Sequence, residues 1–202
     1  MQKERRFMTV EFRAEEEEGK RVLSGYAAVY NKLSEDLGGF VEVIRPGAFR
    51  KVLESQPSVL ALFNHDESLI LGATDNNSLA LSDDDTGLWF RSQLPDTPTA
   101  DEVWSLVRGG YLGKCSFAFV VGEEEWGELE GRVLRQIHDV AGLYDVSVVS
   151  RPAYVNTSVS ARALEKAKEV KESGSEGTDD GSQTVAQELD ALKREIEIES
   201  MK

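Results

Sequence analysis

The stretch that decides the fold of this chain is Gly109-Gly110-Tyr111-Leu112-Gly113-Lys114-Cys115-Ser116-Phe117-Ala118-Phe119-Val120-Val121. Glycines followed at once by a run rich in Phe and Val are typical of a turn that leads into a β-strand. Side chains of a strand point alternately to opposite faces, so Cys115 and Ser116 cannot both face one pocket. Cys115 shares its face with Phe117 and Phe119, which indicates core, whereas Ser116 shares its face with the small Ala118. Ser116 is therefore the candidate nucleophile, although serines at strand starts often bond only local backbone.

The composition limits the class of protein and its partners. A chain of 202 residues is long enough for one well-buried domain with an appendage. Acidic residues exceed basic residues by 37 to 23, and a net charge of −14 repels nucleic acid, so we expect no nucleic-acid partner. Cys115 is the single cysteine, which excludes an internal disulfide. No apolar run approaches the roughly 20 residues of a membrane span, and no apolar signal segment follows the basic start, so we expect no membrane partner and a cytoplasmic location.

Most of the remaining chain predicts short strands. The hydrophobic patterns place strands at 7–13, 21–30, 40–44, 59–63, 69–72, 79–81, 88–91, 116–121, 132–138 and 142–150, and helices at 48–55 and 98–108. The first two strands are expected to pair as a hairpin, and the acidic segment 122–131 to form a hairpin tip. Thr97 is the expected cap of the second helix, with Pro98 in its first turn. The chain is therefore predicted to be mainly β with flanking helices.

Two further residues carry candidate chemistry. His65 follows the apolar strand 59–63, where an imidazole is a reasonable general base, with an ordinary loop histidine as the alternative. Asp145 lies in an apolar strand whose alternation puts Asp145 and Ser147 on one face. An acid in such a strand is either an edge residue in water or the partner of a buried polar group.

Together, Ser116, His65 and Asp145 have the residue types of a nucleophilic triad. A serine hydroxyl is a poor nucleophile until a base takes its proton, and the base works best when a carboxylate fixes its tautomer. The order of these residues along the chain depends on the fold and raises no objection. The acidic segment 82–87 lacks the spacing of a calcium-binding loop and is predicted to be a solvated turn, so we expect neither metal nor cofactor.

Several separate motifs also carry a family resemblance. They are 25–31, 42–49, 62–66, 116–119, 144–149 and 152–154, in which the chain reads GYAAVYN, EVIRPGAF, LFNHD, SFAF, YDVSVV and PAY. From about residue 7 to about residue 162 the chain resembles the caudovirus prohead serine proteases, and several motifs in order are more specific than any one. The resemblance implies an assemblin-like fold, a closed β-barrel of about seven mostly antiparallel strands flanked by helices.

The same resemblance implies roles for individual residues. The His of the family's Asn-His motif is the base and the Ser of its Ser-Phe motif the nucleophile, which implies His65 and Ser116 here. The acid before Val-Ser is usually Glu in the family, whereas this chain has Asp145. The related herpesvirus assemblins use a second histidine, so His138 is the alternative third member. Arg151 is a candidate for oxyanion support, with an ordinary surface arginine as the alternative.

The resemblance implies that the chain is a serine endopeptidase of capsid maturation. It implies cleavage of the scaffolding segment of the phage major capsid protein, and of the enzyme itself, inside the procapsid within the bacterial host cytoplasm. The portal protein and a second copy of the chain are further candidate partners. The alternative is a catalytically inactive assembly or scaffold protein that retains the fold. An esterase is disfavoured because the Gly-x-Ser-x-Gly elbow is absent around Ser116.

The composition changes near the C-terminus and predicts two parts, a protease domain at 1–162 and a tail at 163–202. Within the tail we expect a charged helix at 163–171, a linker at 172–183, and an amphipathic helix at 184–202 with an apolar stripe of Val185, Leu189, Leu192 and Ile196. The stripe suits a partner helix or a self-associating coil, and the resemblance implies that the tail is removed by self-cleavage. A disordered, dispensable tail is the alternative.

Overall fold

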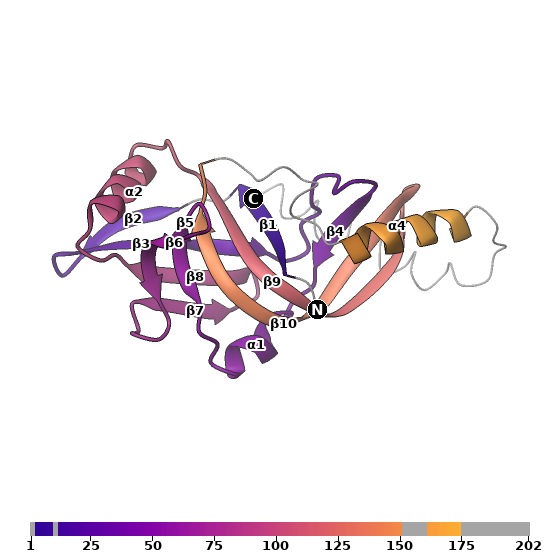
Figure 1. The fold of residues 1–202 in the computed structure, drawn as a ribbon, viewed down its shortest axis with the longest axis horizontal. Coiled ribbons are helices and arrows are strands. Elements are labelled where there is room, and N and C mark those ends of the chain that lie inside the picture. Colours follow the sequence, from indigo (N-terminus) through magenta and orange to yellow (C-terminus); the bar gives the residue numbers. More distant parts are fainter. Residues whose placement is uncertain (1–2, 10–11, 151–160, 175–202) are drawn as a thin grey trace.

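The computed structural model of this chain describes residues 3–9, 12–150 and 161–174 (Figure 1). In these residues one sheet has six strands, in the order β1 (Glu4–Thr9), β9 (Lys114–Leu129), β10 (Arg132–Val148), β5 (Leu60–Phe63) and β6 (Asp66–Ala73), with β4 (Phe40–Ile44) also paired to β10. A second sheet has four strands, in the order β2 (Arg13–Glu17), β3 (Lys20–Val29), β8 (Gly87–Gln93) and β7 (Leu79–Asp83). The helices are α1 (Arg50–Glu54), α2 (Pro98–Arg108) and α4 (Ala161–Gly174). The predicted class, mainly β with flanking helices, is confirmed.

The predicted closed barrel is wrong, because the strands of the described residues form two open sheets. The predicted mostly antiparallel pairing is found in six of the eight strand pairs of the described residues, and the two exceptions lie at the centre of the larger sheet. There β10 pairs parallel with β4 along its first half and parallel with β5 along its last residues. Because β4 and β5 pair with successive parts of β10, they lie one after the other along it. The sheet therefore becomes longer and does not close into a barrel.

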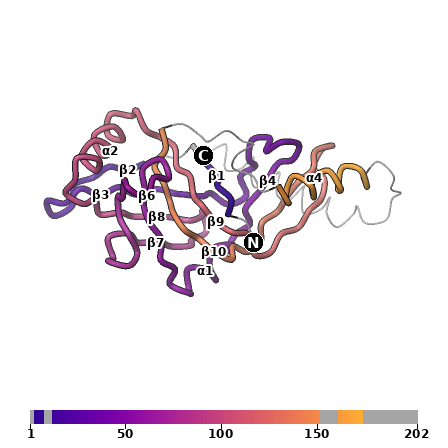
Figure 2. Tube along the Cα trace, in the orientation of Figure 1, coloured from indigo at the N-terminus to yellow at the C-terminus, as the bar shows by residue number. Residues whose placement is uncertain are grey.

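The long hairpin of β9 and β10 runs from the middle of the molecule to the side where α4 lies (Figure 2). The predicted strands 132–138 and 142–150 are one strand, and most of the predicted acidic tip 122–131 belongs to β9. The turn consists of Glu130 and Gly131, with φ of 53° and 75°. The glutamates between Glu123 and Glu128 are mostly exposed to water. Such a run of polar residues is also typical of a loop, which is why the sequence predicted a hairpin tip here.

The first predicted hairpin pairs differently from the expectation. The hairpin is formed by β2 and β3 around Glu18 and Gly19, with φ of 52° and 77°. Strand β1 leaves this hairpin and pairs antiparallel with β9, where Phe7 lies opposite Ser116. The alternation from Phe7 onward determines which face of the sheet each side chain occupies, but it does not determine which strand lies alongside. The predicted pairing was therefore wrong.

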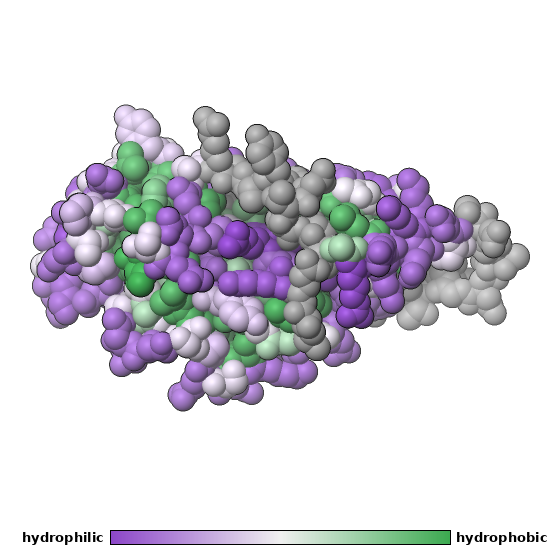
Figure 3. Space-filling view, viewed as in Figure 1, coloured by the Kyte–Doolittle hydropathy of each residue, from purple (hydrophilic) through white to green (hydrophobic). Residues whose placement is uncertain are grey.

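The largest cluster of buried apolar side chains fills the space between the two sheets and α1. Its aromatic centre joins Phe49 to Phe117, with ring centroids 5.7 Å apart, and Phe117 to Phe119, at 4.9 Å. The sheets meet where the Ser92 hydroxyl donates to the Leu71 carbonyl over 2.8 Å. Hydrophilic side chains cover most of the face drawn in Figure 3, with smaller apolar areas between them. The fold is therefore a sandwich-like core of two sheets from which the part of the β9–β10 hairpin around its turn projects. We call this projecting part the hairpin arm.

A buried ionic network joins three strands of the larger sheet. Arg6 of β1 contacts Glu42 of β4 over 2.7 Å, and Arg135 of β10 contacts both Glu4 and Glu42, over 2.9 and 3.0 Å. Burial by itself raises the pKa of Glu4, but the hydrogen bond from Arg135 and the charges of both arginines outweigh burial and lower the pKa below its ordinary value of 4.5. The network holds β1, β4 and β10 in register.

Helix α4 packs on the hairpin arm. Ala163 and Ala167 are buried against Phe40 and Val133, so the predicted helix at 163–171 is confirmed and is slightly longer than expected. The amphipathic stretch predicted at 184–202 lies outside the described residues, and the division of the chain at 162/163 stays a prediction. None of the described helices combines the length and the apolar character needed to cross a membrane.

Replacing Arg135 with Met is expected to lower the free energy of unfolding by about 3–5 kcal/mol, because it removes a cation that contacts two buried carboxylates. Urea unfolding followed by circular dichroism measures this change. The exposed Arg132 of the same strand is the matched control, and its replacement with Met should change stability by less than about 0.5 kcal/mol. Equal losses in both variants contradict a structural role for the network.

The lowered pKa of Glu4 predicts a pH dependence of stability. A carboxylate whose pKa is lower in the folded state stabilises the fold fully above its unfolded pKa of about 4.5, and this stabilisation is lost as the pH falls through the folded value. Glu4→Gln should therefore be less stable than wild type at neutral pH and should lose less stability on acidification below about 4.5. Urea unfolding curves between pH 3 and 7 give the free energy of unfolding of each protein as a function of pH. An equal pH dependence in wild type and Glu4→Gln contradicts the prediction.

Candidate active site

His65 lies in a two-residue turn between β5 and β6. Asn64 and His65 have φ of 54° and 58°, the left-handed values that a tight hairpin turn of type I′ requires. The turns of the other two tight hairpins, β2–β3 and β9–β10, have glycine at the second position, where this turn has His65. A left-handed conformation costs a residue with a Cβ about 1–2 kcal/mol. Contacts elsewhere must therefore hold the imidazole in place.

Asn64 ties this turn to the end of β10. The Asn64 backbone N–H donates to the Val148 carbonyl over 2.9 Å. The Asn64 side-chain Oδ1 accepts the Ser150 backbone N–H over 2.9 Å and the Ser150 hydroxyl over 3.3 Å. Asparagine also tolerates the left-handed region better than most residues. The turn that carries His65 is thus attached to the strand that carries Asp145.

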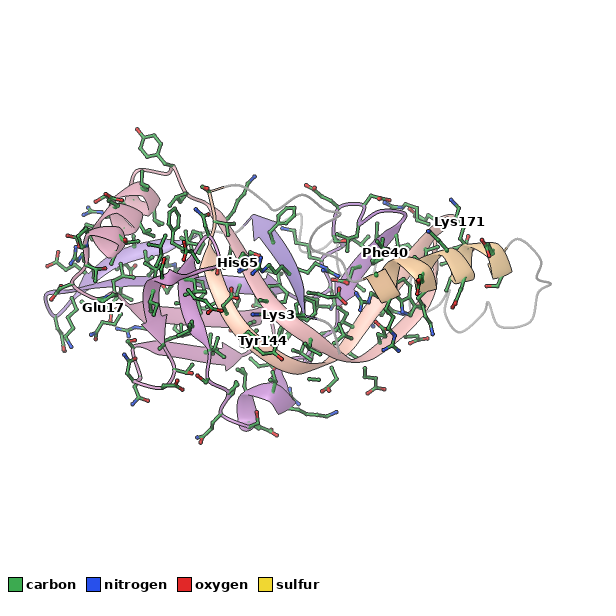
Figure 4. All side chains as sticks on the ribbon, in the orientation of Figure 1. Lys3, Glu17, Phe40, His65, Tyr144 and Lys171 are labelled. Atoms are coloured by element: carbon green, nitrogen blue, oxygen red, sulfur yellow. The ribbon has the colours of Figure 1, made fainter. Side chains whose placement is uncertain are left out.

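The His65 imidazole bridges Ser116 and Asp145. Its Nε2 lies 2.6 Å from the Ser116 hydroxyl oxygen, and its Nδ1 lies 2.5 Å from Oδ1 of Asp145. These contacts join residues 51 and 80 positions apart in the chain. Figure 4 shows His65 where the turn meets the two long strands. The structure therefore brings together the three side chains that the sequence analysis proposed.

Electrostatics assign the proton within the His65–Asp145 pair. Burial raises the pKa of Asp145, but the hydrogen bond and charge of His65, the hydrogen bond of Ser147 and the charge of Lys3 outweigh burial, so the pKa lies below its ordinary value of 3.8. An ionised carboxylate only accepts hydrogen bonds, so Nδ1 of His65 carries a proton and donates it. In the neutral form of His65 with this tautomer, Nε2 has a free lone pair directed at the Ser116 hydroxyl. This is the arrangement in which an imidazole acts as a general base toward serine.

Comparison with known proteins identifies the family of this chain. A family model described as caudovirus prohead serine protease matches residues 8–173. The chain belongs to this family. It is 30% identical over 149 residues to the prohead protease of Enterobacteria phage HK97, an alignment that covers 71% of this chain and 61% of that relative. The solved structure of the bacteriophage T4 capsid assembly protease is similar with a TM-score of 0.47 and 11% identity, over 75% of this chain and 100% of that chain.

In this member of the prohead serine protease family, Cys115 faces away from the candidate triad of Ser116, His65 and Asp145. It lies in the apolar cluster with Phe117 and Phe119, as the alternation of the strand predicted. Burial raises the pKa of its thiol to about 12, which keeps it protonated at neutral pH. The neighbouring Ser116, although only 4% exposed, contacts His65 on the opposite face.

Two predicted site residues remain, His138 and Arg151, and of these only His138 is described. His138 lies further along β10, and its Nε2 is 3.4 Å from Oε2 of Glu125. Asp145, not His138, contacts the second nitrogen of His65. Arg151 lies outside the described residues. Among the described residues no group of three or more His, Cys, Asp or Glu side chains is placed to hold a metal ion.

Sequence analysis missed two contributors to this site. Asn64 attaches the turn to β10, and its signal was an asparagine before histidine between two strands. Ser147 contacts both His65 and Asp145. Its signal was its position two residues after Asp145, on the same face of the strand.

Replacing Asn64 with Gly keeps the left-handed turn accessible but removes the side-chain contacts with Ser150. We expect the rate at which a fluorophosphonate probe labels Ser116 to fall on the order of 10-fold, because His65 is held less firmly. Asn64→Asp keeps the accepting oxygen and tolerates the turn, so it should label faster than Asn64→Gly. Labelling is measured by mass spectrometry on folded protein, and equal rates in Asn64→Gly and wild type contradict the role of this contact.

Proposed function

We propose that this chain is a serine endopeptidase that uses Ser116 as nucleophile, His65 as general base and Asp145 as the residue that orients the base. The observation that carries the proposal is the position of His65, whose two ring nitrogens contact the hydroxyl on one side and the carboxylate on the other. Membership of the prohead serine protease family supports the same reaction class. The chain spans 61% of the HK97 relative, so the activity of the whole protein remains part of this proposal.

The proposed reaction follows from the positions of the protons. Ser116 Oγ attacks the carbonyl carbon of the scissile peptide bond while Nε2 of His65 takes the hydroxyl proton. Asp145 accepts the Nδ1–H hydrogen bond throughout and stabilises the imidazolium. His65 then gives its proton to the leaving amine, and the C–N bond breaks to leave an acyl ester on Ser116. Water, deprotonated by His65, attacks the ester carbonyl; the C–O bond to Ser116 then breaks, His65 returns the proton to Ser116 Oγ, and the new C-terminal carboxyl product leaves. Arg151 is the proposed support for the oxyanion.

The proposed substrates are proteins of the assembling phage capsid. We propose that the peptidase acts within the procapsid, in the cytoplasm of the bacterial host, on the scaffolding segment of the major capsid protein. Self-cleavage is proposed to remove the tail at 163–202, and the portal protein and a second copy of the chain are further proposed partners. The family description and the name of the HK97 relative, a prohead protease, support this setting.

A catalytically inactive assembly protein is the second candidate. One observation favours it, since Ser116 and Asp145 are each only 4% exposed and a substrate carbonyl must reach the hydroxyl. The hydrogen-bonded arrangement of His65 favours the peptidase, because an assembly protein has no use for a base aligned on a serine.

The decisive experiment compares the intact masses of wild type, Ser116→Ala and Asp145→Asn after expression, together with fluorophosphonate labelling. Wild type should lose its C-terminal tail and take up one label, whereas Ser116→Ala should keep its full mass and take up none. Asp145→Asn should be slower by about 10³–10⁴-fold, because the amide favours the wrong histidine tautomer. Ser105→Ala, on the exposed surface of α2, is the control and should match wild type.

The opposite outcome is equally clear. If folded wild type and Ser116→Ala have the same full mass and neither is labelled, the peptidase proposal is wrong and the assembly protein is supported. If wild type is labelled but keeps its tail, the nucleophile is active and only the proposed self-cleavage fails.

A further inference from the structure

The His65–Asp145 pair has a further hydrogen-bonding neighbour in Ser147. The Ser147 hydroxyl donates to Oδ1 of Asp145 over 2.7 Å, and its oxygen lies 3.1 Å from Nδ1 of His65. The residue is 1% exposed, so bulk water does not reach its hydroxyl. A buried hydroxyl must satisfy its hydrogen-bonding capacity within the protein. Ser147 does so with two members of the proposed triad.

The position of Ser147 follows from the register of the sheet. On β10 it comes two residues after Asp145, so both side chains lie on the same face. It lies opposite Ser116 of β9 on one side and Leu62 of β5 on the other. Ser147 is therefore at the point where the strands carrying the nucleophile, the carboxylate and the histidine turn meet.

We propose that Ser147 is a positioning residue that fixes the carboxylate of Asp145 and the ring of His65 in the orientation needed for proton transfer. This inference rests on the proposed peptidase for its catalytic consequence. The Ser147 hydroxyl donates a hydrogen bond to Asp145. The Nδ1–H of His65 donates mainly to Asp145, and the Ser147 oxygen is its second, longer contact. Each of the two groups then has a second contact that restricts its rotation.

The hydroxyl also affects the charge balance of the pair. When His65 becomes an imidazolium, its Nδ1 proton must remain on nitrogen for Asp145 to act as an ionic partner. A donor to the same carboxylate oxygen disperses negative charge and makes that oxygen less basic. The other titratable groups that act on Asp145 are His65 from the β5–β6 turn, Lys3 ahead of β1 and Cys115 of β9. Of these, Lys3 also lies over the ring of Tyr144, 4.6 Å from its centroid (Figure 4).

The kinetic test compares Ser147→Ala with Ser147→Thr and Ser92→Ala on a peptide substrate. Ser147→Ala should lower kcat by about 10- to 100-fold, the effect of a lost hydrogen bond to a charged group, with KM changed less than about twofold. Ser147→Thr restores the hydroxyl and should recover most of kcat. Ser92 is an equally buried serine that donates to the Leu71 carbonyl and not to a member of the proposed triad, so Ser92→Ala should keep kcat.

A spectroscopic test does not depend on turnover. The chain has two histidines, so a sample with ¹⁵N-labelled histidine gives two imidazole signals, assigned with His138→Gln. The Nδ1 proton of His65 should resonate at low field in wild type and move or broaden in Ser147→Ala, but not in Ser92→Ala.

The possible outcomes separate the two proposals. If Ser147→Ala keeps the kcat and the His65 proton signal of wild type, Ser147 has no positioning role. If Ser147→Ala and Ser92→Ala lose activity equally and in proportion to unfolded protein, Ser147 is merely structural, which also overturns the inference. If wild type is inactive but the His65 signal moves in Ser147→Ala, the positioning contact is supported and the peptidase proposal fails. Should Ser147→Ala not fold, Ser147→Cys, with similar volume and a weaker donor, takes its place and should show the same kcat loss and signal shift.

Discussion

The pairing of β10 with β9 on one side and with β5 on the other is the constraint on which the candidate site depends. The antiparallel register puts Ser116 on the same face as Asp145, and the parallel register ends where the His65 turn begins. A shift by one residue would turn Ser116 into the core and present Cys115 instead. The bulky aromatic residues on the Cys115 face make that shift costly, so core packing protects the geometry of the site.

The chain buries charge in two places, with different consequences. In the network of Arg6 and Arg135 with Glu4 and Glu42, each carboxylate meets a permanently charged guanidinium, which gives a rigid connection between strands. At the candidate site the partner of the buried carboxylate is a histidine, which gains and loses a proton easily. The same physics of burial and pairing therefore stabilises the fold in one place and provides a movable proton in the other.

The strained backbone of the turn at Asn64 and His65 also determines where the imidazole ring lies. Its left-handed conformation would be easier for glycine, and the hydrogen bonds of Asn64, Asp145 and Ser116 offset the cost of placing an imidazole there. A two-residue turn leaves little freedom for the backbone, so the ring is delivered to one place. Stability and candidate chemistry thus depend on the same few contacts.

Local features of the sequence determined the faces of the strands. The alternation around Ser116 separated it from Cys115 and put Asp145 with Ser147, and the cap at Thr97 and Pro98 marked the start of α2, because these patterns depend on neighbouring residues alone. Only the tertiary structure decided that 132–148 is one strand, that the sheets stay open and that Asp145 rather than His138 contacts His65. The physical reason is that strand pairing depends on hydrogen bonds between segments far apart in the chain, and period-two alternation is the same whichever strand lies alongside.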